Sequence, residues 1–520
     1  MRKLTIILLT FIVWAPLGAQ TFEKTIKSNA SAWDAPVEVL INENDQIIIT
    51  LVNQERTSDS LRFKNVTQFY LLSKEGDILK SKKIKPKDIF PSIDTSFNDL
   101  YTSSGILDNQ SYIFSAQLRT NAPTTYSNLL YKLDSNFNII DFSVNDTLID
   151  SSVVFPVMKK INNRIFLSGY VFEYTRRVFF GIFGELDQQL NENTKIYFDT
   201  VDSLYLNDVK NFLIAENGDR YLFSGVYNPP PSSIVKPIHL LHLDSNNHFI
   251  KKRQLDYPMR SYDDFPIYFP PINSFWTSDS TFLIATAPST ATDFKGDIQL
   301  FVYDTAFNQI RYKRIGSRDT SEYSLFSQGA VYDSTCDCFY FATTKRTSSD
   351  QYPLFGTGDT TDFHLIKFDK KLNILFDRYY RRNNTLLFNT LNTDSEGNVI
   401  MVGSVQEPDF TDSFNRELYI LKVDSNGNYN PVGLAETNKI DQLNYSIFPN
   451  PTSGELTFRQ YNLMENYQML LFDSQGRKVS EYNFVQSDND FNISNLPTGI
   501  YVYQLKDSKG RGSSGKIVKK

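Results

Sequence analysis

Short apolar runs separated by polar turn residues recur through residues 20–430. The clearest repeated phrase is an apolar run that ends in Asp and is followed by turn residues, as in Leu129–Asp134 and Leu365–Asp369. The anchor positions of this phrase are Ser73, Asp134, Asp187, Asp244, Asp304, Asp369 and Asp424. Successive anchors after the first lie between 53 residues (Asp134 to Asp187) and 65 residues (Asp304 to Asp369) apart. Such a near-constant spacing predicts seven copies of one structural unit.

Each repeated phrase is preceded by a second pair of apolar runs. Phe212–Ala215 and Tyr221–Gly225, for example, flank the polar turn Glu216–Asp219. Asn, Asp and Gly tolerate the positive φ that tight hairpins require, so each unit is predicted to hold two hairpins, that is, four strands. Four-stranded units at this spacing are typical of a β-propeller, in which packing sheet on sheet buries both faces of every sheet.

The predicted fold of residues 20–430 is therefore an all-β propeller with seven blades. Six or eight blades remain open, since the first and last units could share strands. Tandem β-sandwiches would need about 100 residues per domain, and a parallel β-helix would repeat at a much shorter period. The units resemble the blades of pyrroloquinoline-quinone-like secreted propellers, through endings such as Lys132–Asn138 and Lys422–Asn428.

The N-terminus has the features of a secretory signal peptide. Arg2 and Lys3 precede the apolar stretch Leu4–Leu17, and Ala19 supplies a small residue at a cleavage point. This pattern predicts a signal peptide over residues 1–19. The remaining apolar runs are shorter than the ~18 residues of a membrane-spanning helix, so we expect no transmembrane segment in the mature chain.

Composition narrows the function classes. The formal net charge is −6, spread along the chain, which argues against a nucleic-acid partner because that would need a basic stripe. The two cysteines, Cys336 and Cys338, leave three alternatives: a small local disulfide, a reduced pair, or plain turn and strand residues. A single C-x-C lacks the paired spacing of a zinc site.

The last part of the chain has a different pattern. Residues 431–443 lack strand alternation and are predicted to be a linker. Residues 444–520 are predicted to form a small β-sandwich. Its expected strands are Glu455–Phe458, Tyr467–Phe472, Lys478–Tyr482, Phe491–Ile493, Gly499–Leu505 and Lys516–Val518.

Three motifs within this segment carry a resemblance. They are Phe448–Thr452 (FPNPT), Asp473–Arg477 (DSQGR) and Leu496–Tyr501 (LPTGIY), followed by the basic strand Gly515–Lys520. Residues 445–520 thereby resemble the type A C-terminal sorting domain of the type IX secretion system. The resemblance implies transport by the outer-membrane secretion machinery, cleavage near the linker, and attachment to surface lipopolysaccharide or release. The residues that it marks are Pro449, Asn450, Pro451, Gly476, Leu496, Pro497, Gly499, Tyr501 and Lys516.

Signals for catalysis are weak. His239 and His242 are an odd number of residues apart on an expected strand and so face opposite sides. The chain has no Gly-x-Ser-x-Gly sequence, and Asp424–Asn428 lacks the downstream Glu of a calcium loop. We therefore predict no catalytic, cofactor or metal residues. The predicted function is a secreted or cell-surface propeller that binds a glycan or a protein. A polysaccharide hydrolase or lyase on the same scaffold, and a structural adhesin, are the alternatives.

Overall fold

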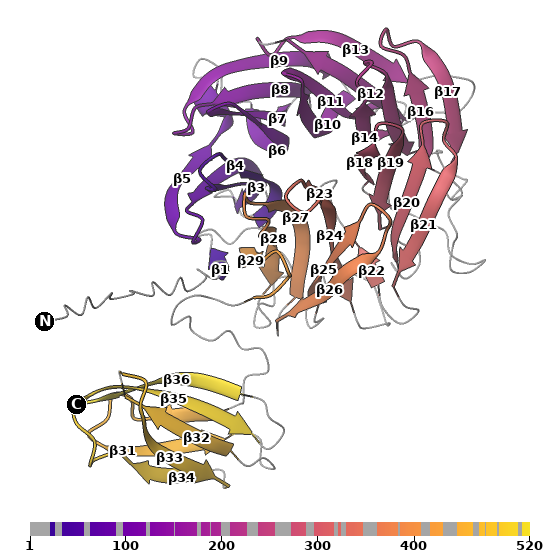
Figure 1. The fold of residues 1–520 in the computed structure, drawn as a ribbon. Helices are drawn as coiled ribbons and strands as arrows, with labels where there is room; N and C mark the ends of the chain where they lie inside the picture. Colours follow the sequence, from indigo (N-terminus) through magenta and orange to yellow (C-terminus); the bar gives the residue numbers. More distant parts are fainter. Residues whose placement is uncertain are drawn as a thin grey trace, which may run out of the picture. The chain divides into compact units, whose positions relative to one another are not determined.

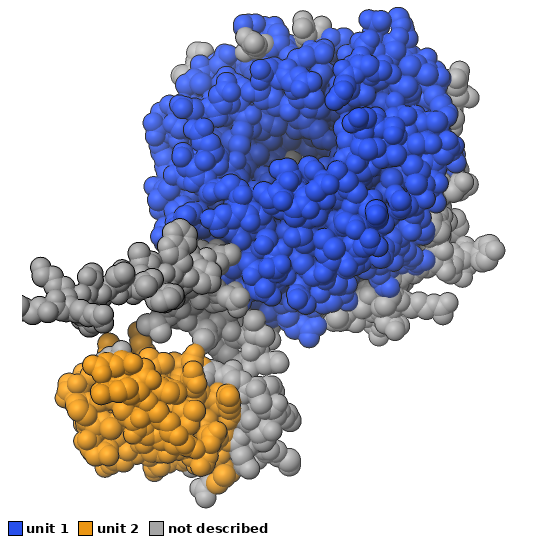
Figure 2. Space-filling view, in the orientation of Figure 1, with its two compact units in different colours: residues 1–431 blue, residues 432–520 orange. Residues whose placement is uncertain are grey.

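The computed structural model divides the chain into two compact units, residues 1–431 and 432–520 (Figure 2). The residues it describes are 21–26, 34–56, 63–89, 97–120, 125–149, 151–173, 178–187, 189–198, 208–225, 238–254, 272–287, 296–316, 321–323, 329–346, 361–382, 385–406, 416–429, 445–460, 467–473, 475–485, 488–507 and 512–520. The predicted signal peptide (1–19) and linker (431–443) lie outside them. Apart from the short helix α1 (Pro86–Ile89), every regular element described is a strand, so the all-β prediction is confirmed.

The described part of the first unit forms seven antiparallel sheets arranged in a ring (Figure 1). Each repeat anchor follows or ends the third strand of one sheet, so sequence units and sheets correspond one to one. The first three sheets contain β2 (Asp34–Ile41), β3 (Ile47–Arg56), β4 (Phe63–Leu72) and β5 (Ile78–Ile84); β6 (Phe97–Asp108), β7 (Ser111–Thr120), β8 (Thr125–Leu133) and β9 (Ile139–Ile149); and β10 (Ser151–Ile161), β11 (Arg164–Glu173), β12 (Val178–Leu186) and β13 (Glu192–Phe198).

The other four sheets follow in chain order. They contain β14 (Asp208–Ile214), β15 (Arg220–Gly225), β16 (His239–Leu243) and β17 (Phe249–Gln254); β18 (Ile272–Ser278), β19 (Thr281–Thr286), β20 (Ile298–Asp304) and β21 (Gln309–Ile315); β22 (Ser321–Tyr323), β23 (Ala330–Asp333), β24 (Cys338–Arg346), β25 (Thr361–Asp369) and β26 (Ile374–Arg381); and β27 (Thr385–Thr393), β28 (Val399–Gln406) and β29 (Glu417–Val423) with β1 (Phe22–Ile26). The N-terminal strand β1 thus completes the last sheet by pairing antiparallel with β29.

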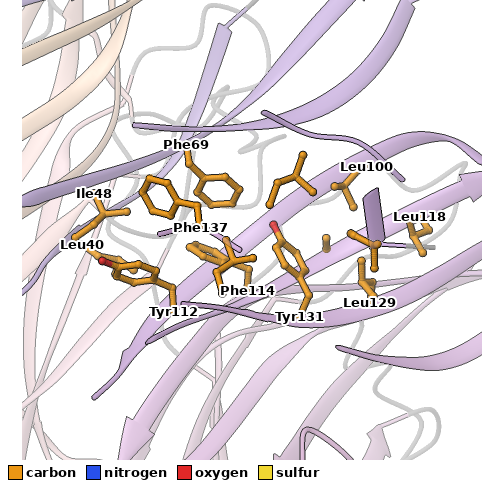
Figure 3. Close-up of a cluster of buried hydrophobic side chains, with 14 residues drawn as sticks. Leu40, Ile48, Phe69, Leu100, Tyr112, Phe114, Leu118, Leu129, Tyr131 and Phe137 are labelled. Carbon is orange, nitrogen blue, oxygen red and sulfur yellow. The ribbon is translucent and has the colours of Figure 1, made fainter. Parts of the chain in front are cut away.

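A buried apolar cluster lies between each sheet and the next. Between the first two sheets, Phe69 and Phe137 stack with ring centroids 5.4 Å apart, and Phe114 stacks on Tyr131 at 5.6 Å (Figure 3). Between the last sheet and the first, one cluster joins Ile26, Ile400 and Ile420 to strands β2, β3 and β4. This cluster closes the ring, because it packs the last sheet of the first unit against the first sheet.

The repeated Asp fixes the turn that follows it. In the second sheet the Asp134 carboxylate accepts hydrogen bonds from the backbone N–H groups of Asn136 (2.8 Å) and Asn138 (2.7 Å). The Asp134 N–H also donates to the Asn138 carbonyl. Ser73 makes the same two side-chain contacts, at 3.2 Å each, which explains how it replaces Asp in the first unit. The repeated Asp therefore forms a turn. Asp424–Asn428 adopts the same turn, with Asp424 accepting from the N–H groups of Asn426 and Asn428.

The fourth residue of this turn has positive φ in all seven units. It is Gly or Asn in three of them, as expected (Gly76, Asn247 and Gly427), but four units carry a large apolar residue there. Phe137, Leu190, Phe307 and Leu372 all adopt φ between 59° and 67°. A left-handed backbone costs a residue with a side chain roughly 1–2 kcal/mol. All four side chains are buried in the clusters between sheets, so apolar burial offsets that cost.

Replacing Phe137 by Gly is expected to destabilise the protein by about 2–4 kcal/mol. The glycine relieves the positive-φ backbone by about 1 kcal/mol, but loss of a fully buried Phe costs about 3–5 kcal/mol. The free energy of unfolding, measured by denaturant titration, checks the balance. A stabilised Phe137→Gly protein would show that backbone strain outweighs side-chain burial at this turn.

Outer-strand side chains of one sheet bind the Asp turn of the next. The seventh and ninth residues after the anchor supply many of these donors. Lys80 and Lys82 reach the side chains of Asn136 and Asn138 at 2.9 and 3.0 Å, and Lys313 reaches the Leu372 carbonyl at 3.0 Å. Lys251 and Arg253 bind the carbonyls of Ala306 and Phe307. Half-buried and exposed cations of the outer strands thus connect neighbouring sheets.

The C-terminal unit contains two sheets that share one apolar cluster. One sheet holds β30 (Tyr445–Phe448), β31 (Glu455–Gln460) and β34 (Asp488–Asn492). The other has the order β33 (Lys478–Phe484), β32 (Tyr467–Phe472), β35 (Gly499–Asp507) and β36 (Gly512–Lys519). The cluster includes Phe458, Phe484 and Leu505, so both sheets contribute to it. The expected strands all appear, several of them longer than predicted.

Candidate functional site

The ring of the first unit surrounds a central hollow, which is open in the space-filling view (Figure 2). The first strands of neighbouring sheets contact one another: β2 lies against β6 and β27, and β10 lies against β6 and β14. These first strands are therefore the innermost ones and form the wall of the hollow.

The innermost strands share an irregularity. The pairing register shifts by one extra residue at Val37 in β2, Ser103 in β6, Lys210 in β14 and Asn389 in β27, and in β10 two residues stand opposite one residue of β11. Each shift is a β-bulge, which bends a strand and redirects side chains. No residue pattern along these strands predicts the bulges, because the strands are buried along most of their length and show no regular alternation for a bulge to interrupt.

Polar side chains near the bulges connect one innermost strand to the next. Ser104 donates to the Phe155 carbonyl at 2.8 Å, and Asn211 donates to the Ile272 carbonyl at 2.7 Å. Asn392 donates to the Val39 carbonyl at 3.0 Å and so joins the last sheet to the first. These three polar side chains therefore hold neighbouring sheets of the ring together.

A few innermost groups have features suited to binding. Lys210, the bulge residue of β14, pairs with Asp208, whose other carboxylate oxygen has no hydrogen-bond partner within the described residues. Burial raises the pKa of Asp208, because it penalises the charged form. Burial also lowers the pKa of Lys159 to about 7, while this ammonium donates to the Phe212 carbonyl at 2.8 Å. Lys210 and Asp208 bind each other, and Lys159 binds a backbone carbonyl, so all three side chains already have a partner within the fold.

Of the four histidines, His364 has the most charged surroundings. Its ring is buried in β25, with Nδ1 3.0 Å from Glu322 Oε2 and Nε2 2.8 Å from Asp377 Oδ1. It also stacks on Tyr379 at 4.3 Å. Although burial opposes the charge, the two carboxylates raise the pKa of His364. His239 and His242 lie on one strand, and His242 binds Asp219 at 2.9 Å.

A His364→Gln protein is expected to lose most stability in mildly acidic solution. Because the folded pKa of His364 is raised, its imidazolium contributes fully below the unfolded pKa of about 6.5, and the contribution is lost as pH rises through the folded pKa. Thermal unfolding of both proteins at about pH 5.5 and pH 9 measures the difference. An equal loss at both values would show that His364 contributes through packing alone.

Cys336 and Cys338 form a disulfide across the turn between β23 and β24. This selects the local-disulfide alternative, while both residues also hold the expected turn and strand positions. Asp333 lies beside the pair, with Oδ2 3.4 Å from Cys336 Sγ. Among the described residues, Asp333, Cys336 and Cys338 are the one group of three possible metal ligands that lie close together. Their two sulfur atoms are bonded to each other, so neither is a thiolate ligand here.

In the C-terminal unit, the FPNPT motif contacts the final strand β36. The Asn450 amide donates to the Lys516 carbonyl at 2.7 Å and accepts from the Val518 N–H at 2.9 Å. The Thr452 N–H donates to the Val518 carbonyl, and the Lys520 N–H donates to the Thr452 carbonyl, both at 2.9 Å. The motif therefore covers part of the outer edge of β36, which edge strands otherwise leave open.

The same strand contacts the LPTGIY motif through a buried lysine. Lys519 Nζ donates to the carbonyls of Ser494 (2.6 Å) and Leu496. Tyr501 is also buried, and its hydroxyl donates to the Pro497 carbonyl at 2.6 Å. Lys519 and Thr452 were not among the marked residues, although Thr452 ends the FPNPT motif and Lys519 belongs to the basic strand Gly515–Lys520.

The DSQGR motif forms the same turn as the repeat anchors of the first unit. Asp473 accepts from the N–H groups of Gln475 (2.9 Å) and Arg477 (3.0 Å), and Gly476 has φ 76°. Gly476 is therefore explained by its backbone. Gly499 is not, since its φ is ordinary and a Cβ placed on it would meet no atom within 4 Å.

Eight of the nine marked residues fall into two groups by exposure, and Gly499 is half-buried at the start of β35. Tyr501 is buried and Leu496 is half-buried, so both serve the fold. The exposed ones are Pro449, Asn450, Pro451, Gly476, Pro497 and Lys516. The structure brings the FPNPT and LPTGIY motifs together around β36, whereas it records no such contact for the DSQGR turn among the described residues.

Comparison with known proteins identifies the C-terminal unit. Residues 446–520 match the family described as the secretion system C-terminal sorting domain. The predicted resemblance is thereby confirmed, and the domain marks the chain as a secreted or cell-surface protein. No curated protein matches the chain. Within the described residues, no helix is long and apolar enough to cross a membrane.

Solved structures with similar folds are distant in sequence. A fungal alcohol oxidase in complex with copper is 10% identical, with 96% of this chain and 99% of that chain covered and a TM-score of 0.42. The β-propeller domain of the trilobed protease from Pyrococcus furiosus is 9% identical, with 78% and 98% covered and a TM-score of 0.40. A protein of unknown function from Dyadobacter fermentans is 10% identical, with 77% and 98% covered and a TM-score of 0.39.

Proposed function

We propose that this secreted or cell-surface chain, exported by the type IX secretion system through its C-terminal sorting domain, is a ligand-binding propeller. In this proposal the exposed motif residues around β36 are read by the outer-membrane machinery. The sorting domain is then removed near residues 431–443, and the propeller is attached to surface lipopolysaccharide or released. Outside the cell, the propeller binds a glycan or a protein.

The observation that carries the sorting part is the open surroundings of Gly499. Neither its backbone nor its packing requires glycine, and the residue opens the strand after the exposed Pro497. A glycine that the fold does not need is suited to close approach by another protein. The exposed Asn450 and Lys516 lie on the adjacent strand edge, joined by the hydrogen bond described above.

Gly499→Ala is the variant that tests this reading. Its fold is expected to keep its unfolding temperature, while the fraction of protein on the cell surface falls several-fold with accumulation in the periplasm. Gly476→Ala is the matched control, since it strains a positive-φ turn and should destabilise the unit by about 1 kcal/mol. Normal surface delivery of Gly499→Ala, alongside retention of a chain lacking residues 444–520, would place recognition elsewhere on the domain.

For the propeller, the proposal rests on a difference between the two ends of the ring. Because antiparallel strands alternate in direction, the turns between the first and second, and the third and fourth, strands share one end. These are tight turns such as 42–46 and 134–138. The other strand ends lie at the opposite end of the ring, and there the chain has long connections from β15 to β16 (residues 226–238) and from β17 to β18 (residues 255–271). Binding residues concentrate on such loops.

A panel of purified polysaccharides and extracellular glycoproteins, immobilised on a sensor, tests the binding part with the full chain. Replacing 255–271 by a short Gly-Ser linker should abolish binding to the positive panel members. Asn246→Lys, at a tight turn of the opposite end, should leave binding unchanged. Equal binding by both variants would contradict the assigned end. Release of reducing ends from a polysaccharide would instead favour the hydrolase or lyase.

A further inference from the structure

The outermost strands of the ring differ sharply in charge. The sequence of β5 carries three lysines, β17 carries Lys251, Lys252 and Arg253, and β21 carries Arg311, Lys313 and Arg314. Strand β9 carries no Lys or Arg, and its charged residues are Asp141 and Asp146. Cations on an edge strand discourage pairing with foreign strands, so β9 lacks a protection that these three other outer strands have.

Strand β9 also presents an apolar stripe. Ile140, Phe142 and Val144 are exposed by 54%, 43% and 40%. Because side chains alternate along a strand, these three lie on the same face. No other outer strand within the described residues presents three exposed large apolar side chains at alternate positions.

The length of β9 and its place in the sheet also leave it open to pairing with another strand. With 11 residues, β9 exceeds the 7 residues of β5 and the 6 of β17. It pairs with β8 on one side and is the edge of its sheet among the described strands. At the two positions where β5 and β17 carry cations that bind the next sheet, β9 carries Asp141 and Ser143, which have no ammonium or guanidinium group to donate.

We propose that β9 is a strand-addition site for an extended segment of another protein that alternates apolar and basic residues. The backbone edge supplies hydrogen bonds, the Ile140–Val144 stripe supplies apolar contact, and the exposed Asp141 carboxylate selects cations. A second copy of this chain fits less well, because pairing β9 with β9 would gather four aspartates and no cation. This proposal is independent of the loop-bearing end assigned above.

The probe is a fluorescent ten-residue peptide of alternating Val and Lys, measured by anisotropy against the full chain. A matched peptide with Glu in place of Lys controls for charge. The Lys peptide is expected to bind, to bind at least 10-fold more weakly at high salt, and to protect backbone amides of β9 from hydrogen exchange. The Glu peptide should bind at least 10-fold more weakly at low salt.

Two variants locate the site. Phe142→Lys combined with Val144→Lys, at exposed positions, should weaken binding of the Lys peptide at least 10-fold with an unchanged unfolding temperature. Ile250→Lys on β17, whose side chain is 51% exposed, is the matched control and should change binding less than twofold. Equal weakening by both variants, no protection of β9, or no binding would overturn the proposal. Dimers of the unmodified chain that the β9 variant abolishes would assign the edge to a second copy instead.

Discussion

A chain that lacks β1 (Phe22–Ile26) is expected to lose the closed ring and to unfold at a much lower denaturant concentration. Strand β1 is the outermost strand of the last sheet, and all five of its residues pair with β29. Its Ile26 also lies in the cluster between the last sheet and the first. Losing the five-residue ladder and one buried Ile should lower the free energy of unfolding by more than ~3 kcal/mol.

Three side-chain contacts add to that loss. Lys24 Nζ donates to the Gly76 carbonyl at 2.7 Å, so β1 also binds the turn of the first sheet. Glu23 pairs with Arg382 at 2.7 Å, and the same guanidinium contacts Thr25. Deletion of β1 would therefore leave Arg382 and the edge of β29 exposed together.

Urea unfolding of the full chain and of the β1 deletion measures the effect, by tryptophan and tyrosine fluorescence. Deleting residues 433–437 removes the same number of residues from the predicted linker and is the control, which should keep the unfolding midpoint. A β1 deletion with an unchanged midpoint would show that the other sheets hold the ring closed without it.

The position of β1 also connects the fold to export. The predicted cleavage point after Ala19 lies three residues before Phe22, and Thr21 is already buried. A signal peptide that is still inserted in a membrane would therefore hold the closing strand close to that membrane. We expect ring closure to follow signal-peptide removal, since only then is β1 free to reach β29.

The periodicity of the sequence was sufficient to predict the sheets, because each unit repeats the same hydrogen-bonded turn after its third strand. Asp134 and its counterparts accept the same two backbone N–H groups in unit after unit, so one residue type marks the end of the third strand in every unit but the first, where Ser73 takes its place. Such local hydrogen bonds are visible in sequence because donor and acceptor are four residues apart or fewer.

Features that depend on distant residues could not be predicted in this way. Phe137 adopts positive φ because residues of the first sheet, such as Phe69, cover its side chain. The bulge at Lys210 depends on how β14 fits between its neighbours. His364 acquires its charge environment from Glu322 and Asp377, 42 and 13 residues away in sequence.

The sorting motifs lie between these two cases. Their order and spacing identified the domain, but did not show which of their residues are buried in the fold and which are exposed. Lys516 and Lys519 look equivalent in the basic strand Gly515–Lys520, yet Lys516 is exposed and Lys519 is buried. Strand alternation does not separate Lys519 from Ile517, since both fall on the inward face. The carbonyls of Ser494 and Leu496 explain why a cation is placed inward there.

Replacing Lys519 by Met is accordingly expected to destabilise the C-terminal unit by ~2 kcal/mol or more. The ammonium donates to two carbonyls, and a hydrogen bond to a charged group contributes about 1.5–3 kcal/mol. Met fills a similar length but leaves both carbonyls without that donor. The turn that begins LPTGIY should then loosen, and with it the surface presented by Pro497 and Gly499.

Lys520→Met is the matched control, because Lys520 is the exposed neighbour whose backbone N–H, not its side chain, binds Thr452. Calorimetry of the full chain should show the C-terminal transition lowered in Lys519→Met and unchanged in Lys520→Met. Surface delivery should fall in the first variant alone. If Lys519→Met kept its transition temperature but still failed to reach the surface, the lysine would be read directly by the machinery, and its contacts with Ser494 and Leu496 would be secondary to export.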